Sequence, residues 1–142
     1  MYYTPRGKDL RKQYVLDVTT AQKFLDISVF GKDIVPFFHY FQIEHIVVAP
    51  FNHFCQCLIK VLEGREIKVE AIADRMSFKW PGGYRGIEIV DYDRLPEKEF
   101  DAAIITSNFH KNAIMDTMLQ KNIPLEKIIG INTILFGTER LP

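Results

Sequence analysis

The chain has 142 residues, of which 47% are hydrophobic and 25% are charged, so one domain with a substantial core is expected. Eighteen basic and eighteen acidic side chains cancel, which argues against the clustered basic surface of a nucleic-acid-binding domain. No apolar run approaches the roughly 20 residues that span a bilayer, and residues 1–6 lack the apolar core of a signal peptide. We therefore expect a cytoplasmic protein without a membrane span or a nucleic-acid partner.

Residues 1–18 are expected to form an N-terminal extension, and residues 19–142 a single α/β domain. This domain is predicted to begin with a helical pair over residues 19–41. Thr19 and Gln22 have the spacing of a capping box, in which a hydroxyl binds one free N–H group and a glutamine reaches back to another. The first helix of the pair is therefore predicted to start at Thr19.

The second helix of the pair follows Gly31, which suits the left-handed residue that ends a helix, and Asp33, which can cap the next helix. Three phenylalanines then recur at helical spacing, namely Phe37, Phe38 and Phe41. Two interpretations of this aromatic face stay open. It packs into the core, or it forms an interface with a second copy of the chain.

The sheet core is predicted over residues 44–131. Its apolar segments are residues 46–49, 69–73, 102–105 and 128–131. Most of these segments are almost continuously apolar, which is typical of strands covered on both faces in a parallel sheet. A weaker segment over residues 85–89 is predicted to add another strand.

Amphipathic helices are expected between these strands, over residues 54–62 and 114–119. Strands that alternate with helices predict a Rossmann-like α/β fold, a doubly wound and mainly parallel sheet. In such a sheet the first and fourth strands lie side by side, where the winding direction of the chain reverses. A ligand crevice then opens at the carboxyl ends of these strands.

Four stretches of the chain carry a family resemblance, and they read VFGKDIVPFFHYFQIEHIVVAP, LIKVLEGREIKVEAIAD, YRGIEIVDYDRLPEKEFDAAIITS and NIPLEKIIGI. In this order and spacing they resemble the small NAD(P)-binding Rossmann-like domains of bacterial polysaccharide and sugar-nucleotide biosynthesis proteins. The resemblance covers residues 19–131. It implies a small nucleotide-type ligand, with NAD(P) or a nucleotide sugar as the cofactor.

The glycines of that family are replaced in the turn after the first strand, where this chain has Pro50, Asn52 and Cys55. Pro50 cannot donate an N–H group to a phosphate, and Cys55 adds a side chain where helix and strand pack closely. Asn52 can cap the following helix, whose free N–H groups and dipole still favour an anion. The replacements argue against the usual dinucleotide pose but leave anion binding open.

Asp74 ends the second predicted strand. In the family, an acidic residue about 20 residues past the glycine motif accepts hydrogen bonds from a ribose. The same carboxylate could instead cap the turn that runs through Arg75 and Met76. Both interpretations stay open, and they do not exclude each other.

A second polar cluster closes the fourth strand, and it consists of Thr106, Ser107, Asn108 and His110. If the first and fourth strands are neighbours, this cluster faces Asn52 and His53 across the crevice. Imidazole, hydroxyl and amide groups together can hold a phosphate or a sugar. The alternative is that these residues cap the following helix, since Ser and Asn are preferred there.

Residues 78–85 form a loop with the only tryptophan, Trp80, and with Tyr84. The loop either stacks on a base or sugar or covers the edge of the sheet. Cys55 and Cys57 lie two positions apart on a helix, so they point to different sides and are expected to be packing residues. The sequence has no Walker loop, nucleophile elbow or zinc-ligand spacing, and no catalytic residue is identified.

Three functions are compatible with these patterns. The first is a nucleotide- or nucleotide-sugar-binding module, non-catalytic alone, that serves sugar-nucleotide or surface-polysaccharide metabolism. The second is an NAD(P)-dependent oxidoreductase or sugar-nucleotide-modifying enzyme with an atypical phosphate loop. The third is a scaffold that keeps the fold for contacts in a homodimer or with a catalytic partner protein.

Overall fold

The computed structural model describes the backbone of residues 5–138 and 140, and the side chains of residues 11, 12, 14–138 and 140. A parallel sheet of five strands forms its centre, in the order β3-β2-β1-β4-β5. The strands are β1 (His45–Ala49), β2 (Lys68–Ala73), β3 (Ile89–Val90), β4 (Ala102–Ile105) and β5 (Ile128–Gly130). This order is that of a Rossmann-like doubly wound sheet, and the predicted pairing of the first and fourth strands is confirmed.

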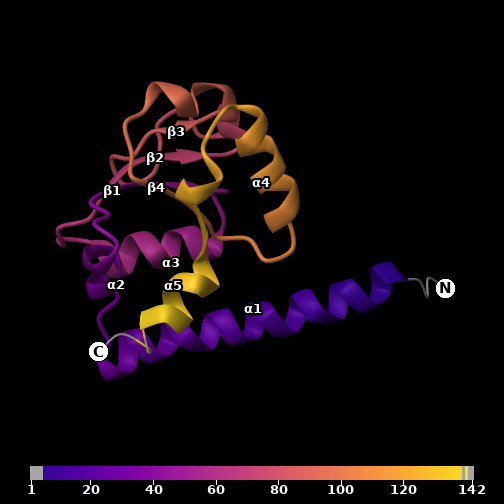
Figure 1. Ribbon diagram of the computed structural model, residues 1–142, viewed down its shortest axis with the longest axis vertical. Coiled ribbons are helices and arrows are strands. Elements are labelled where there is room, and N and C mark those ends of the chain that lie inside the picture. Colours follow the sequence, from indigo (N-terminus) through magenta and orange to yellow (C-terminus); the bar gives the residue numbers. More distant parts are fainter. Residues whose placement is uncertain (1–4, 139, 141–142) are drawn as a thin grey trace.

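Helices cover both faces of the sheet (Figure 1). One face carries α1 (Pro5–Phe30), α2 (Val35–Tyr40), α3 (His53–Leu62) and α5 (Ile131–Thr138). The other carries α4 (Lys111–Gln120) and the 3-10 helix η2 (Tyr92–Glu97). Two more 3-10 turns, η1 (Ser77–Lys79) and η3 (Leu125–Lys127), lie in connecting segments. The predicted N-terminal helical pair is confirmed as α1 and α2.

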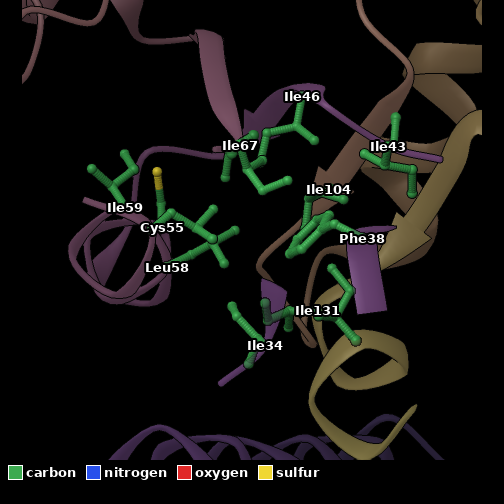
Figure 2. Packing of buried hydrophobic residues seen from close by; sticks show 14 of the residues in the cluster. Ile34, Phe38, Ile43, Ile46, Cys55, Leu58, Ile59, Ile67, Ile104 and Ile131 are labelled. Carbon is green, nitrogen blue, oxygen red and sulfur yellow. The ribbon is translucent and has the colours of Figure 1, made fainter. Parts of the chain in front are cut away.

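The core consists of two layers that meet at the sheet. Along β1, Ile46 and Val48 point into the cluster beneath α2, α3 and α5, while Val47 and Ala49 point into the cluster beneath α4. All four are completely buried, which explains why this strand is apolar at every position after His45. Figure 2 shows the first cluster, with Phe38 beside Ile104 of β4 and with residues of α3 facing the sheet.

The prediction that the first helix starts at Thr19 is wrong, because α1 already begins at Pro5. The hydroxyl of Thr19 donates to the carbonyl of Val15 at 2.9 Å, and the hydroxyl of Thr20 donates to that of Leu16 at 2.7 Å. Both threonines therefore bond back along an existing helix and do not cap a new one.

The structure agrees with the predicted roles of Gly31 and Asp33 between the two helices. Gly31 has a φ of 67°, as expected of the residue that follows a helix in the left-handed region. Val35 is the first residue of α2, and its N–H group donates a hydrogen bond to the Asp33 carboxylate at 3.0 Å. Phe37 and Phe38 are buried in the core, whereas Phe41 is exposed and packs on Phe37 with 4.9 Å between ring centroids.

The strand predicted over residues 85–89 is largely wrong. Tyr84 and Ile87 instead exchange two backbone hydrogen bonds, at 2.9 and 2.8 Å, across a tight reversal. Arg85 and Gly86, at the tip of this reversal, have φ values of 50° and 79°. The chain therefore turns here, and β3 contains only Ile89 and Val90.

Helix α5 was not predicted, and Ile131, expected to end the last strand, instead begins this helix. Its buried residues are Ile131, Ile134 and Leu135. They pack into the same core cluster as Phe24 of α1, so α5 fills the space between α1 and the sheet.

Asp101 sets the relative position of β1 and β4 at their amino ends. One carboxylate oxygen accepts hydrogen bonds from the N–H groups of Glu44 and His45, each at 2.9 Å. The N–H group of Asp101 donates in turn to the carbonyl of His45 at 2.7 Å. The Glu44 and His45 N–H groups lower the pKa of the Asp101 carboxyl, because they stabilise its charged form.

We predict that Asp101→Ala lowers the free energy of unfolding by about 1 kcal/mol at neutral pH, a figure reduced for the exposure of the carboxylate. Because the folded-state pKa is lowered, this contribution is present above the unfolded-state pKa and is lost as the pH falls through the folded-state value. Urea unfolding of both proteins between pH 7 and pH 3 should show the difference shrinking with acid. An unchanged difference across this range would contradict the assignment, and Asp101→Asn, which keeps an acceptor oxygen, should lose less at pH 7.

Candidate functional site

The turns after β1 and β4 are joined by Asn52 and Thr106. The Asn52 side chain caps α3 by accepting from the N–H group of Cys55 at 2.8 Å, and its amide donates to the carbonyl of Thr106 at 3.1 Å. The Thr106 hydroxyl is buried and lies 3.1 Å from the side-chain oxygen of Asn52 and 3.2 Å from the carbonyl of Ala49. The two loops therefore meet at the carboxyl edge of the sheet, and both polar ends of Asn52 are used within the protein.

The turn after β1 carries packed side chains. Cys55 is completely buried, and burial raises the pKa of its thiol to about 12. Phe51, between Pro50 and Asn52, packs its ring against Trp80 at 4.8 Å and Tyr84 at 5.2 Å between centroids. The loop of residues 78–85 thus covers the edge of the sheet, which confirms that interpretation of its aromatic residues.

Asp74 braces the same turn from β2. It is only 8% exposed, and its oxygens accept from the N–H groups of Phe51 at 2.9 Å and Met76 at 2.8 Å. The second bond confirms the turn-capping interpretation. With the Phe51 N–H bound to Asp74 and the Cys55 N–H bound to Asn52, the turn has lost two donors that a pyrophosphate would use. The predicted contact of Asp74 with a ribose stays a prediction.

Asn108 belongs to a polar network that joins three elements. Its amide donates to the Asp17 carboxylate at 2.9 Å and the Thr20 hydroxyl at 3.1 Å, and its oxygen accepts from Asn132 at 2.9 Å. Asp17 and Thr20 lie on α1, and Asn132 lies on α5. The side chain therefore holds both helices to the loop after β4. Ser107 has a local role, since its hydroxyl accepts from the N–H group of His110 at 3.0 Å.

The two histidines of the predicted site line different cavities. His53 is exposed on the first turn of α3 and borders a groove of about 420 Å³ between α1 and α3. His110 precedes α4 and borders a cavity of about 320 Å³ on the other side of the sheet. Because α3 and α4 cover opposite faces, their first turns open in different directions. In the structure Asn52 contacts Thr106, and Asp74 lines the same cavity as His110. His53 and His110 are not brought together.

We name the second of these the α4 cavity. It lies where the carboxyl ends of β1, β2 and β3 meet α4, and its lining residues are Pro50, Asp74, Arg75, Tyr92, His110, Ala113, Ile114 and Thr117. Neither Arg75 nor Tyr92 is among the site residues predicted from the sequence. Their position could have indicated a role in the site, because each residue lies just after the carboxyl end of a strand.

Tyr92 is the most unusual residue in the α4 cavity. The residue is 7% exposed, and its hydroxyl has no hydrogen-bonding protein partner within the part of the chain that the structure describes. Burial, and then the nearby charge of Asp74, raise the pKa of the Tyr92 hydroxyl, which therefore stays protonated at neutral pH. Tyr92 lines the α4 cavity, so a ligand group in the cavity could accept a hydrogen bond from its hydroxyl.

The mouth of the α4 cavity favours an anion. Arg75 is exposed there and acts electrostatically on Tyr92. Helix α4 has ten residues and no side-chain cap, so the N–H groups of its first turn, from Lys111 to Ala113, have no intrahelical acceptor. The positive end of the helix dipole lies at the same place. Arg75 and the helix terminus favour a negatively charged group, and Pro50, Ala113 and Ile114 give the cavity an apolar wall. The cavity therefore suits a small anion that carries an apolar ring and whose charge lies away from the Asp74 carboxylate.

A larger cleft, of about 650 Å³, lies at the opposite, amino edge of the sheet. Most of its charged side chains are engaged with other side chains or with the backbone. Lys127 donates to the carbonyl of Phe100 at 3.1 Å, His45 contacts Glu70 at 2.7 Å, and Lys121 pairs with Asp93. These contacts already occupy most of the polar groups of the cleft, and we take the α4 cavity as the candidate because it contains Tyr92, whose hydroxyl has no partner among the described residues.

No protein-family model matches the chain, and neither does any curated protein. Among the side chains of residues 11, 12, 14–138 and 140, no group of three or more histidine, cysteine, aspartate or glutamate residues is arranged to hold a metal ion. Residues 5–138 and 140 include no helix with the length and apolar character required to cross a bilayer. The functional assignment therefore rests on the geometry of the site.

We predict that Asn52→Ala destabilises the protein by about 2 kcal/mol, because it removes the α3 cap and the bond to Thr106 together. Urea unfolding monitored by circular dichroism measures this loss. Asn112→Ala is the matched control, since Asn112 is exposed on the first turn of α4, and it should change stability by less than about 0.5 kcal/mol. Equal effects of the two substitutions would show that Asn52 does not brace the turn.

The two thiols should differ in reactivity. Burial raises the pKa of both, but Cys55 is completely buried whereas Cys57 is half-buried, so Cys57 should react slowly with iodoacetamide at pH 8 and Cys55 not at all. Peptide mass spectrometry after labelling measures each site. Both should react once guanidinium unfolds the chain, and native labelling of Cys55 at the rate of Cys57 would contradict the packing of α3.

Proposed function

We propose that the protein is a binding module for a nucleotide-type ligand, a nucleotide or nucleotide sugar, which it holds in the α4 cavity. The cavity lies at the point where the winding of the sheet reverses, the usual place for ligands in this class of fold. Its volume of about 320 Å³ is near the lower limit for ligand pockets, which favours a mononucleotide-sized group over a whole dinucleotide. The module serves sugar-nucleotide or surface-polysaccharide metabolism beside a catalytic partner.

The observation that carries the proposal is the unpartnered hydroxyl of Tyr92. Asn52, Asp74 and Thr106 are each hydrogen bonded within the protein, so they explain the stability of the edge without a ligand. Tyr92 is different, because a buried donor without an acceptor is rare in folded proteins. In the proposed complex Tyr92 donates to the ligand, and Arg75 and the first turn of α4 bind its phosphate.

A scaffold without a small ligand is the second candidate. It is favoured by the closed turn at residues 50–55, where Phe51 and Cys55 are packed and two N–H groups are taken by side chains. The enzyme hypothesis has less support. His110, Tyr92 and Asp74 all line the cavity, but the raised pKa of Tyr92 makes it a poor general base, and both Asp74 oxygens already accept backbone hydrogen bonds.

Thermal-shift screening with UMP, AMP, UDP-sugars, NAD(H) and NADP(H) tests the proposal. A ligand present at 100 times its Kd should stabilise the fold by about 2.7 kcal/mol. Tyr92→Phe should weaken binding about tenfold, the equivalent of one hydrogen bond of about 1.4 kcal/mol, and Arg75→Ala should weaken binding of phosphorylated ligands only. Neither substitution should lower the stability of the free protein.

Tyr40→Phe, at an exposed position on α2, is the matched control and should bind like the native chain. Flat melting curves with every compound would reject the binding module in favour of the scaffold. Binding that is unaffected by Tyr92→Phe and Arg75→Ala would move the ligand out of the α4 cavity.

A further inference from the structure

Helix α1 has apolar residues on two different sides. One side faces the body of the protein, where Thr20 and Phe24 are buried and Ile27 packs against the core. The other side faces solvent and carries Tyr14, Val15, Val18, Ala21, Leu25 and Val29. The exposed fractions of its larger members run from 49% at Val18 to 72% at Tyr14. A helix that is apolar on two sides is normally covered on both.

Four of these six exposed residues follow the spacing of a coiled-coil seam. Tyr14, Val18, Ala21 and Leu25 are separated by four, three and four residues, which is the alternation of core positions in a heptad repeat. At 1.5 Å per residue, the stretch from Tyr14 to Val29 is about 22 Å long. A repeat of 3.5 residues keeps a seam in contact with another helix, so the geometry of this surface is suited to a helix.

We propose that two copies of the chain associate through α1, antiparallel, about a two-fold axis midway between Val18 and Ala21. This register sets Tyr14 opposite Leu25 of the second copy and Val18 opposite its Ala21, so each bulky residue meets a complementary position. A two-fold interface needs a surface that matches itself in this way. The association goes beyond the proposed ligand binding and does not depend on it, because α1 and α4 cover opposite faces of the sheet.

A groove beside the seam provides room for the second copy. It lies between α1 and α3, has a volume of about 420 Å³, and is bordered by Ala21, Leu25 and Ser28 from α1. Phe54, Cys57 and Val61 of α3 form its other wall. In the proposed register, Tyr14 of the second copy lies next to Leu25 and can enter this groove.

The distribution of charge favours the antiparallel arrangement. The seam positions Tyr14, Val18, Ala21 and Leu25 carry no charge, and Asp26 lies on the same flank of the seam as Val15. Arg11 and Lys12 precede the seam. A parallel pair would set these like charges side by side, whereas the antiparallel pair places them at opposite ends, about 25 Å apart.

The position of α1 leaves the seam accessible. Figure 1 shows that α1 runs past α3 and α5 and that its N-terminal half extends beyond the body of the protein. Helices in proteins derive most of their stability from packing and not from intrinsic propensity. A second α1 supplies packing for the extended turns around Tyr14 and Val18, which this chain alone does not cover.

Sedimentation equilibrium over a concentration series tests the association. The native chain should approach twice the 16.5 kDa mass of one chain, and Val18→Glu combined with Leu25→Glu should sediment as a monomer with an unchanged circular dichroism spectrum. Phe78→Glu is the matched control, because it also places a charge at an exposed apolar residue, outside α1, and it should stay dimeric. A monomeric native chain at every concentration, or a dimer that survives the double substitution, would overturn the proposal.

Disulfide trapping tests the orientation. In a Cys57→Ser background, Tyr14→Cys and Leu25→Cys variants are mixed in equal amounts and oxidised, and the buried Cys55 does not interfere. An antiparallel pair predicts a crosslink between the two different variants. Crosslinks formed within each variant alone would show a parallel pair and overturn the proposed register.

Discussion

The hydrogen bonds between Asn52 and Thr106 hold the structure together at the point where its winding reverses. Parallel strands β1 and β4 share a ladder, but their outgoing loops lead to helices on opposite faces of the sheet. Asn52 caps one of these helices and binds the end of the other strand at the same time. The edge on which a ligand would rest is therefore ordered before any ligand arrives.

This arrangement separates structural polar groups from groups with unused bonding capacity. Asp74, Ser107 and Asn108 all accept or donate bonds within the protein, so their presence at the ends of strands is explained by caps and braces. Tyr92 differs, because the residue is buried and its hydroxyl has no hydrogen-bonding partner among the residues that the structure describes. A polar group that has no protein partner says more about ligand binding than one that is already hydrogen bonded, because burying it unpaired costs free energy.

Most of the fold could be predicted because burial on both faces leaves a clear pattern in β1 and β4, whose residues are apolar at nearly every position. The start of α1 could not, because a threonine hydroxyl can either cap a helix or bond back within one, and Thr19 does the latter. The site was predicted in part. Adjacency of the loops at Asn52 and Thr106 follows from strand order, but the separation of His53 from His110 depends on which face each helix covers.

The network around Asn108 has a consequence for motion. Its amide group is bonded to Thr20 on α1 and to Asn132 on α5, two residues before the backbone reaches His110 at the α4 cavity. The loop that borders the cavity is thus tethered to the long N-terminal helix on the other side of the sheet. Any displacement of that loop must either stretch these tethers or carry α1 along, so the two faces of the molecule are mechanically connected.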